Sequence, residues 1–349
     1  MIPEYYWGIH WSGNFTEMCG MPCILLENPS NPDGEFYMAM NNEDVRKAVN
    51  TYSDVSVRIL GSKEPQHYYK LLKISYLNEH FEGTALLDWT SDVPWTLMPD
   101  MEYLQAIEMP KNPAPKATFV ARNCNPMNNR MAYVKHIDDA IGVVAASSCY
   151  HNTDWPRCGD RECSKIEAIR PYKIHLAFEN GDSTNFVTDK IYQAFEAGVL
   201  PVWMGTRDVA TAVPKGSYID VADFDTPKDL ALYLIEVLAD ETLYQSYFEW
   251  KNKPFDKEFD DRFRVLWTDP FNCRMCRYID AYKKGLEWDI VKQVAKNTEV
   301  QNEIIESGGE IGIFGFTTQQ FYFIVSLFVI ASILYFACRK RINRKFYLL

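Results

Sequence analysis

Short apolar segments alternate with amphipathic ones along most of the chain. In the first hundred residues, the apolar stretches Val55–Leu60 and Thr84–Leu87 predict strands, and Glu43–Tyr52 and His67–Leu77 have the spacing of helices. The stretch Met109–Lys116 contains three prolines. Because such a stretch cannot continue a helix or a central strand, it predicts a linker between two domains.

After this stretch the chain alternates regularly between strand and helix patterns. Helices are expected to begin at Arg130, Thr188 and Thr226, with Thr188 as an N-cap and Gly198 just beyond the end of its helix. The expected strands are Ala117–Ala121, Ile141–Ala146, Lys173–Phe178, Val199–Met204 and Ser217–Val221. Repeated strand–helix units predict an α/β fold with a doubly wound parallel sheet.

The last apolar segment, Phe321–Cys338, contains no charged residue. A helix of this length rises about 1.5 Å per residue and, with the apolar flank before it, spans the roughly 30 Å hydrocarbon core of a bilayer. The tail after it carries five basic residues and no acidic one, and positive residues favour the cytoplasmic side. We therefore expect a C-terminal membrane anchor with a cytosolic tail and a lumenal body; a buried core helix is the alternative.

The charge of the chain supports this division. The 349 residues carry a net charge of −11, and without the five basic residues of the tail 31 basic residues face 47 acidic ones, a net charge of −16. Such an acidic body excludes a protein that mainly grips nucleic-acid backbones. The N-terminus has neither the basic nor the apolar region of a signal peptide, so we expect that a leader is missing.

Eight of the nine cysteines precede the apolar segment, and an even number suits disulfides in an oxidising compartment. Two pairs, Cys19 with Cys23 and Cys273 with Cys276, have spacings that also suit a four-thiolate zinc site. Disulfides are the favoured interpretation because the lumenal topology and a glycosylation sequon at Asn14 point to the same compartment.

Residue chemistry alone predicts a ligand site where Lys173–Phe178 ends. In an open α/β sheet, ligands bind beyond the carboxyl ends of the strands, and here the loop Glu179–Phe186 leads into the helix at Thr188. The N–H groups and dipole at that helix end can hold phosphate oxygens. Lys190 adds a cation and Asp189 can accept ribose hydroxyls, although a simple capped helix remains the alternative. Neither GxGxxG nor GxxxxGK[ST] is present.

The run Tyr172–Gly205, YKIHLAFENGDSTNFVTDKIYQAFEAGVLPVWMG, resembles the donor-site signature of the α1,3-fucosyltransferases of glycosyltransferase family 10. The resemblance extends over about Val55 to Tyr278. Within the family, TSDVPW at Thr90–Trp95, SSCYHN at Ser147–Asn152 and CRMC at Cys273–Cys276 look most like the plant and invertebrate enzymes that fucosylate the N-glycan core.

The resemblance implies an architecture and a location. Two Rossmann-like domains would face a cleft, which is the GT-B type of α/β fold, followed by the C-terminal transmembrane helix. The implied location is the Golgi membrane, with a single pass and a lumenal catalytic body. We expect an acceptor-side domain at 1–112, a GDP-fucose-binding domain at 113–290, a stem at 291–319, the transmembrane helix at 320–338 and the basic tail at 339–349.

The chemistry implied by the resemblance is inverting transfer of L-fucose from GDP-fucose to the 3-hydroxyl of a GlcNAc on a glycoprotein glycan. A carboxylate serves as the general base. The piece SKEPQHYYK matches the family pattern there and nominates Glu64, with Glu43, Glu79 and Glu82 as substitutes. Two alternatives remain open: a relative that fucosylates protein hydroxyls, and a catalytically dead membrane protein that binds a glycan or a nucleotide.

The resemblance also assigns the residues that bind the donor. Arg130 and Lys190 are expected to share the diphosphate, with Arg130 donating two parallel hydrogen bonds. The residues require no metal ion, although Mn²⁺ could stimulate the reaction without a fixed protein site. The full set of expected donor contacts is Asn123, Arg130, His175, Asn180, Phe186, Thr188, Asp189 and Lys190.

Three departures from the family pattern fall within this signature. Asn185-Phe186 replaces the usual Asp-Tyr, Asp189 replaces Glu, and Gly181 replaces Ser. They raise two questions: whether the chain is fully active, and whether it uses the donor that is usual in the family. The resemblance further implies that Cys273 and Cys276 pair with Cys19 and Cys23, which would join the two ends of the catalytic region.

Overall fold

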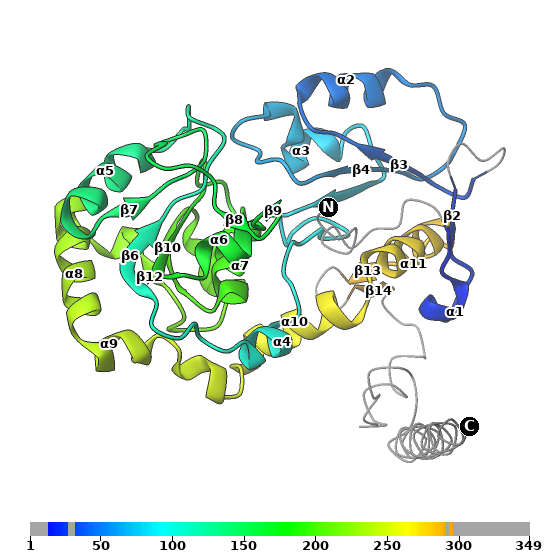
Figure 1. Ribbon diagram of the computed structural model, residues 1–349. Coiled ribbons are helices and arrows are strands. Elements are labelled where there is room, and N and C mark those ends of the chain that lie inside the picture. The colour runs from blue at the N-terminus through cyan, green and yellow to red at the C-terminus, as the bar shows by residue number, and fades with distance from the viewer. Residues whose placement is uncertain (1–12, 27–31, 290–292, 296–349) are drawn as a thin grey trace, which may run out of the picture. The chain divides into compact units, whose positions relative to one another are not determined.

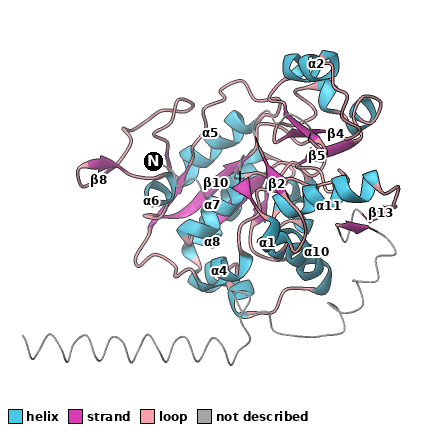
Figure 2. Cartoon of the chain, turned by 90° about the vertical axis from the view of Figure 1, so that its right-hand side faces the viewer, coloured by secondary structure: helices cyan, strands magenta, loops and turns pink. Residues whose placement is uncertain are grey.

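Two separate parallel β-sheets, each covered by helices, organise the chain (Figures 1 and 2). The computed structural model describes residues 13–26, 32–289 and 293–295, and both sheets lie within one compact unit. The chain is therefore an α/β protein, as its alternating pattern predicts.

The first sheet has three parallel strands in the order β3-β4-β5, and an apolar layer covers each of its faces. Leu72 and Leu77 pack against Leu60 on one face, and Met275 and Tyr278 cover Ile59 on the other. Its strands and the helices that cover it are β3 (Glu35–Met38), β4 (Arg58–Ser62), β5 (Gly83–Leu86), α2 (Asn42–Asn50), η2 (Lys70–Leu72), α3 (Ile74–Leu77) and α11 (Phe271–Lys283).

The second sheet has five parallel strands in the order β12-β11-β10-β6-β7. Its central strands β10 and β11 are almost entirely buried, which is typical of a parallel sheet covered on both faces. The strands are β6 (Ala114–Thr118), β7 (Val143–Val144), β10 (Tyr172–Phe178), β11 (Leu200–Met204) and β12 (Ile219–Asp220).

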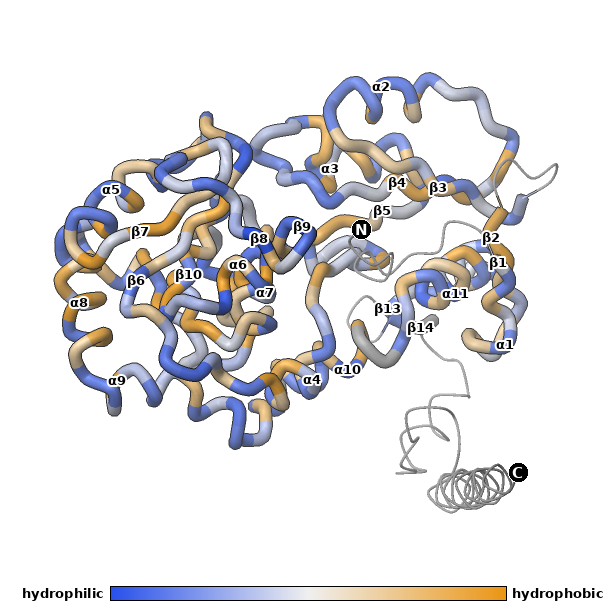
Figure 3. Tube along the Cα trace, in the orientation of Figure 1, coloured by the Kyte–Doolittle hydropathy of each residue, from blue (hydrophilic) through white to orange (hydrophobic). Residues whose placement is uncertain are grey.

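Helices cover both faces of this second sheet. Val134 of α5 and Leu230 of α8 pack with Ile174 on one face, and Ile191 of α7 packs with Ala177 and Trp203 on the other. Figure 3 shows that α8 is mostly hydrophobic whereas α2, on the first sheet, is mostly hydrophilic. The helices of this half are α4 (Met101–Ala106), α5 (Arg130–Ile141), α6 (Lys165–Ile169), α7 (Asp189–Ala197), η3 (Arg207–Thr211), η4 (Val221–Asp223), α8 (Pro227–Ala239), α9 (Glu241–Ser246), η5 (Glu249–Asn252) and α10 (Lys257–Thr268).

The strand–helix–strand unit around α7 and the helix α8 are confirmed, and their ends have the expected chemistry. Gly198 ends α7 in the left-handed conformation, with φ of 69°. Thr226 caps α8 by accepting a hydrogen bond from the Asp229 backbone N–H at 3.2 Å, and Pro227 occupies the first turn.

Three predicted elements differ in the structure. The expected strand Ile141–Ala146 is shorter, because Ile141 still belongs to α5 and β7 contains only Val143–Val144. The expected single helix at His67–Leu77 is instead η2 and α3, because Lys73 between them is extended, with ψ of 131°. The prediction of a linker over Met109–Lys116 is wrong at its C-terminal end, because β6 already begins at Ala114. Pro115 is tolerated in this strand because β7 pairs only with Ala117 and Thr118, and the register with β10 is irregular beside the proline.

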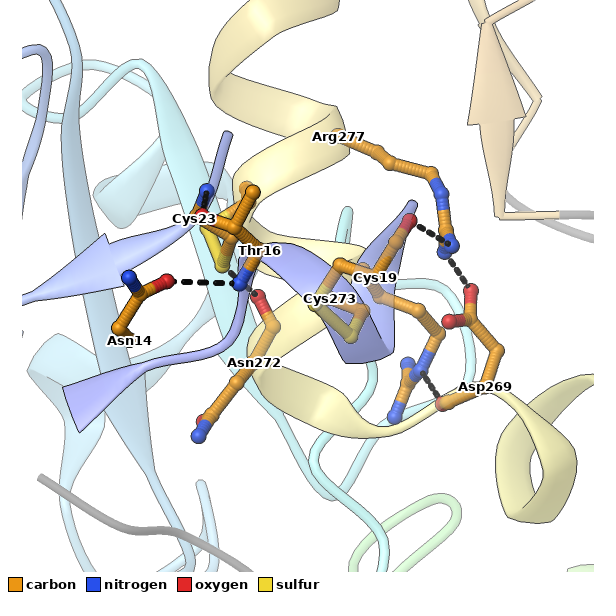
Figure 4. Close-up of a disulfide and its surroundings, with 10 residues drawn as sticks. Asn14, Thr16, Cys19, Cys23, Asp269, Asn272, Cys273 and Arg277 are labelled. Atoms are coloured by element: carbon orange, nitrogen blue, oxygen red, sulfur yellow. Dashed lines mark hydrogen bonds and ion pairs between the residues drawn. A yellow bond between two sulfur atoms is a disulfide. The ribbon is translucent and has the colours of Figure 1, made fainter. Parts of the chain in front are cut away.

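Two disulfides join the N-terminal segment to α11 (Figure 4). Cys19 pairs with Cys273 and Cys23 with Cys276, with Cα separations of 5.1 and 5.7 Å, so the structure agrees with the pairing that the resemblance implies and not with a zinc site. Arg277 adds a hydrogen bond to the Cys19 carbonyl at 3.3 Å. Cys19 is the last residue of α1 (Thr16–Cys19), and Cys23 directly precedes β2 (Ile24–Leu25), which pairs with β1 (Gly13–Asn14) in a two-stranded ribbon.

The predicted glycosylation site Asn14 is exposed, and its side-chain oxygen accepts a hydrogen bond from the Thr16 backbone N–H at 3.0 Å. Two further disulfides join Cys124 to Cys149 and Cys158 to Cys163. The second lies in the hairpin of β8 (Arg157–Cys158) and β9 (Arg161–Glu162). All eight cysteines of the described part of the chain are therefore paired, as an oxidising compartment allows.

Within 13–26, 32–289 and 293–295, no helix is both long enough and apolar enough to cross a membrane. The expected transmembrane helix 320–338 and the tail 339–349 lie outside the described residues. Most of the expected 291–319 stem does so too, although β14 (Val294–Ala295) pairs with β13 (Trp288–Asp289). The domain boundaries therefore stay predictions.

The two bridges to α11 stabilise the fold as a pair. Each closes a loop of more than 250 residues, which in the chain-entropy model is worth about 5 kcal/mol. Once one bridge is formed, however, the other closes only a ring of a few residues, worth about 2 kcal/mol. We expect removal of one pair as a double Ser variant to lower the free energy of unfolding moderately, and removal of both pairs to lower it by several kcal/mol more, measured by urea titration.

The matched control replaces Cys158 and Cys163 with Ser. That bridge spans a sequence separation of 5, so it closes a ring about as small as the one that the second long-range bridge closes. It should lower the free energy of unfolding about as much as removal of one long-range pair. Equal stability of the four-Ser variant and a single-pair variant would contradict this account.

Candidate functional site

The 179–188 loop connects β10 to α7 and closes around the carboxylate of Glu179. Glu179 is fully buried, and its Oε1 accepts hydrogen bonds from the Thr188 backbone N–H at 3.0 Å and from the Thr188 hydroxyl at 2.6 Å. Its Oε2 accepts one from the Lys190 ammonium at 2.5 Å. One buried carboxylate therefore holds the two ends of the loop together.

Lys190 presents a cation at the start of α7. Its side chain is 21% exposed, and its ammonium also donates to the Thr188 hydroxyl at 2.9 Å. Asp189 beside it accepts a hydrogen bond from Gln193 at 2.6 Å. Thr188 lies at the N-cap, but its hydroxyl bonds to Glu179 and not to the helix. The predicted residues Thr188, Asp189 and Lys190 are thus brought together where backbone N–H groups and the helix dipole favour an anion.

Glu64 approaches the same place from the first sheet. It follows β4, and its backbone N–H donates to the Ser62 hydroxyl at 3.1 Å. Its carboxylate makes no hydrogen bond or ion pair with any residue that the structure describes. Burial raises the pKa of Glu64, and the positive charge of Lys190 opposes this shift. The candidate base therefore lies within electrostatic range of the candidate phosphate-binding cation.

Arg130 is a buried residue that connects two segments of the site. Only 1% of it is exposed, and its guanidinium donates to the backbone carbonyls of Phe178, at 2.9 Å, and of Asn123. Burial lowers the pKa of Arg130, and the charge of Glu179 opposes this shift. In this structure Arg130 links the end of β10 to the segment before α5, and its expected bonds to a diphosphate stay a prediction.

Asn123 and Asn180 both contact Tyr68, which belongs to the SKEPQHYYK piece but is not among the expected donor contacts. The Asn123 side chain donates to the Tyr68 hydroxyl at 3.1 Å, and this hydroxyl lies 3.4 Å from the Asn180 carbonyl, to which it donates. The Met127 backbone N–H also donates to that carbonyl, at 2.9 Å. The two asparagines are therefore neighbours, as a shared ligand would require.

His175, an expected donor contact, lies within the second sheet. It lies in the middle of β10, is 1% exposed, and its Nδ1 lies 2.8 Å from the Thr118 hydroxyl in a hydrogen bond. Burial holds the pKa of His175 well below its ordinary value, so the ring is neutral. The strand places this side chain inside the sheet beside Thr118, and its expected contact with the donor stays a prediction.

Two of the three departures from the family pattern, Asn185-Phe186 and Gly181, have partners in the first half of the chain. The Asn185 side chain donates to Asp88 at 2.9 Å, where an aspartate would bring two carboxylates together. The Phe186 ring is 5% exposed and meets the edge of the His67 ring, with centroids 6.1 Å apart. A Cβ at Gly181 would lie 1.8 Å from His67 Nε2. These substitutions therefore fit their neighbours.

Two lysines near Asp189 were missed by sequence reasoning. Burial lowers the pKa of Lys165 to about 8 and that of Lys63 to about 7, and the charge of Asp189 opposes both shifts. Lys165 begins α6, which packs beside α7, and the Lys63 ammonium lies 4.4 Å from the centre of the Trp95 ring. Lys63 directly precedes Glu64 in the SKEPQHYYK piece, whereas no motif marks Lys165; the two come from different segments and approach Asp189 only in the fold.

Several buried polar atoms around the loop have no hydrogen-bond partner among the described residues. Buried atoms of this kind in a native structure call for a ligand, a water or another explanation, because each costs free energy when left unpaired. They are Asn180 Oδ1, Asn128 Oδ1, Arg130 Nε, Gln193 Oε1 and His67 Nε2. Their gathering at the carboxyl end of β10 supports a polar ligand there.

Over the ranges that the structure describes, no group of three or more His, Cys, Asp or Glu side chains is arranged to hold a metal ion. The predicted contacts include two amides, a hydroxyl, a guanidinium and an ammonium group. This combination suits a polar anion such as a nucleoside diphosphate.

Glu179 is expected to be essential to the stability of this site. Glu179→Gln removes the charge opposite Lys190 while it keeps an acceptor for Thr188, and we expect it to lower the free energy of unfolding by about 2–3 kcal/mol in a urea titration. Glu167→Gln is the matched control, because its ion pair with Arg161 is exposed and its role at the start of α6 suits glutamine as well. Equal, small losses in both variants would contradict the account.

Comparison with known proteins agrees with this geometry. A model for the C-terminal part of glycosyltransferase family 10 (fucosyltransferase) matches residues 110–297, more than half of the chain. The chain is 28% identical over 250 residues to GDP-fucose protein O-fucosyltransferase 3 of Xenopus laevis, which covers 62% of this chain and 52% of the relative. It is 34% identical over 157 residues to glycoprotein 3-alpha-L-fucosyltransferase A of Drosophila melanogaster, covering 42% and 29%.

A crystal structure of an alpha1,3-fucosyltransferase with GDP is also similar, with a TM-score of 0.48 and 17% identity over 74% of this chain and 79% of that chain. The chain spans about half the length of the curated O-fucosyltransferase relatives that it matches. With the family match covering the second sheet and the 179–188 loop, this chain belongs to glycosyltransferase family 10, a family of fucosyltransferases.

Proposed function

We propose that this chain transfers L-fucose from GDP-fucose to the 3-hydroxyl of a GlcNAc on a glycoprotein glycan, with the N-glycan core as the first candidate acceptor. One observation carries the proposal. The Lys190 ammonium, fixed by Glu179 at the start of α7, lies within electrostatic range of the Glu64 carboxylate, which has no hydrogen-bond partner among the described residues. An anion-binding cation and a base therefore serve one site.

The proposed reaction is a single displacement. Glu64 takes the proton of the acceptor hydroxyl while that oxygen attacks the anomeric carbon of fucose from the face opposite GDP. The bond between the anomeric carbon and the phosphate oxygen breaks, and its electron pair leaves on GDP. Lys190 and the N-terminus of α7 offset the charge that develops on the leaving group.

Activity is expected to depend on the ionised form of Glu64. Burial raises its pKa above the ordinary value of 4.5. A base works only when it is deprotonated, so we expect kcat/KM to fall as the pH drops through this raised pKa and to reach a plateau above it. Glu64→Gln should lower kcat by about 10²- to 10⁴-fold while GDP binding, measured by calorimetry, is kept.

Glu43→Gln is the control for this test, because Glu43 is an alternative base by sequence but lies on α2 with its side chain 62% exposed, beside Arg46. It should keep wild-type activity. Loss of activity in Glu43→Gln together with full activity in Glu64→Gln would show that the base is misassigned.

A second candidate function is transfer of fucose to a hydroxyl of a protein side chain. Relatives that are named GDP-fucose protein O-fucosyltransferase 3 match up to 64% of this chain, which favours this alternative specifically. The donor and the base would be the same. Only the acceptor side of the site would differ.

The proposed location is the Golgi membrane, with the catalytic body in the lumen. Four disulfides among the described residues support an oxidising compartment. The uncharged segment at 321–338 and the basic residues after it support a C-terminal anchor.

An acceptor screen separates the two candidate functions. The chain is incubated with GDP-fucose and either a glycopeptide that carries the N-glycan core or folded protein domains without glycans, and the products are weighed by mass spectrometry. The proposal expects one deoxyhexose added to the glycopeptide and none to the domains. The opposite result favours the protein acceptor, and no transfer to either with intact GDP-fucose contradicts an active enzyme.

A further inference from the structure

Three consecutive residues after Glu64 connect the first half of the chain to the 179–188 loop. Gln66 donates to Asp88 at 3.3 Å, and Asp88 in turn accepts from Asn185 of the loop. Tyr68 donates to the Asn180 carbonyl at 3.4 Å. His67, between them, makes the most direct connection.

His67 bonds to the loop through both its backbone and its ring. Its backbone N–H donates to the Ser183 hydroxyl at 3.1 Å, and its Nδ1 shares a short hydrogen bond with the same oxygen. The ring also makes an edge-to-face contact with the Phe186 ring. Burial lowers the pKa of His67, and Asp182 opposes this shift, so the docked ring is neutral near pH 7.

The other side of the His67 ring fills the space above Gly181. A Cβ built on Gly181 would lie 1.8 Å from Nε2, 2.1 Å from Cε1 and 2.8 Å from Cδ2 of His67. The φ of Gly181 lies outside the left-handed region, so its backbone is open to other residues. Glycine is required here by the histidine ring and not by the backbone conformation.

We propose that His67 is a positioning residue, which docks the segment carrying Glu64 into the hollow at Gly181 and so fixes the base relative to the donor. This inference rests on the proposed function, because it assumes that Glu64 acts on a donor held at Lys190. It also gives a reason for Gly181, which stands where the resemblance leads one to expect serine.

The docking matters because no hydrogen bond or ion pair in the described structure holds the Glu64 carboxylate itself, so its position depends on how its backbone is fixed. Its backbone is tied at one end by the Ser62 hydroxyl, and three residues later by His67. A shift of about 1 Å in a reacting group can cost about 100-fold in rate. Releasing His67 should therefore lower the rate of the chemical step, whereas the residues that bind diphosphate stay in place.

A double-mutant cycle tests this inference on the full chain, with kcat and KM for GDP-fucose, calorimetric Kd for GDP, and Tm as readouts. His67→Ala should lower kcat about 10- to 100-fold and change Kd for GDP by less than about threefold. Gly181→Ser should lower both kcat and Tm when His67 is present. In the His67→Ala background there is room for the serine side chain, so Gly181→Ser should lower Tm only slightly further.

Two more variants separate positioning from general stability. His67→Asn keeps an acceptor near the Ser183 hydroxyl, and it should recover part of the lost kcat. His80→Ala is the matched control, because His80 is also partly buried in the first half and bonds through Nδ1, at 2.9 Å, but to the Tyr76 carbonyl. It should leave kcat unchanged.

Three results would overturn the inference: wild-type kcat in His67→Ala, an equal loss of kcat in His80→Ala, or the same loss of Tm from Gly181→Ser in both backgrounds. A wild-type chain that does not turn over GDP-fucose overturns the proposed function and the positioning role with it. The Tm cycle then still reports whether His67 and Gly181 are coupled, so the two failures are distinguishable.

Discussion

The site depends on one buried carboxylate. Glu179 lies at the carboxyl end of β10 with no exposed surface, and a charge in that position is costly unless it is fully paired. The Thr188 N–H, the Thr188 hydroxyl and the Lys190 ammonium supply this pairing. The requirement to satisfy Glu179 thus closes the 179–188 loop, places the start of α7 and directs a cation to the proposed diphosphate site.

This loop is fitted to the first half of the chain as well as to its own sheet. Asn185 bonds to Asp88, and Gly181 leaves room for His67, so two departures from the family pattern match residues that come from the other sheet. Substitutions at residues in contact are not independent in their effect on stability. Because Asn185 and Gly181 fit Asp88 and His67, the departures do not by themselves indicate a dead enzyme.

Local chemistry explains what the sequence predicts well. The apolar strands β10 and β11, the Gly198 C-terminus of α7 and the Thr226 N-cap of α8 are determined by neighbouring residues, and these elements are found where the pattern places them. Contacts between distant segments leave no such pattern. Lys63, His67 and Tyr68 reach the site from the segment after β4, and Lys165 reaches it from the start of α6. His175 is placed inside the sheet by its register in β10, which a motif match does not reveal.

A crystal structure of the chain in complex with GDP would test the central claim most directly. The account predicts that the diphosphate lies at the N-terminus of α7 within hydrogen-bonding distance of the Lys190 ammonium, with Glu179 still paired to Thr188. It also predicts an open space between the phosphate and the Glu64 carboxylate, where fucose and the acceptor hydroxyl would meet. A diphosphate bound away from α7, or one separated from Glu64 by packed side chains, would contradict the account.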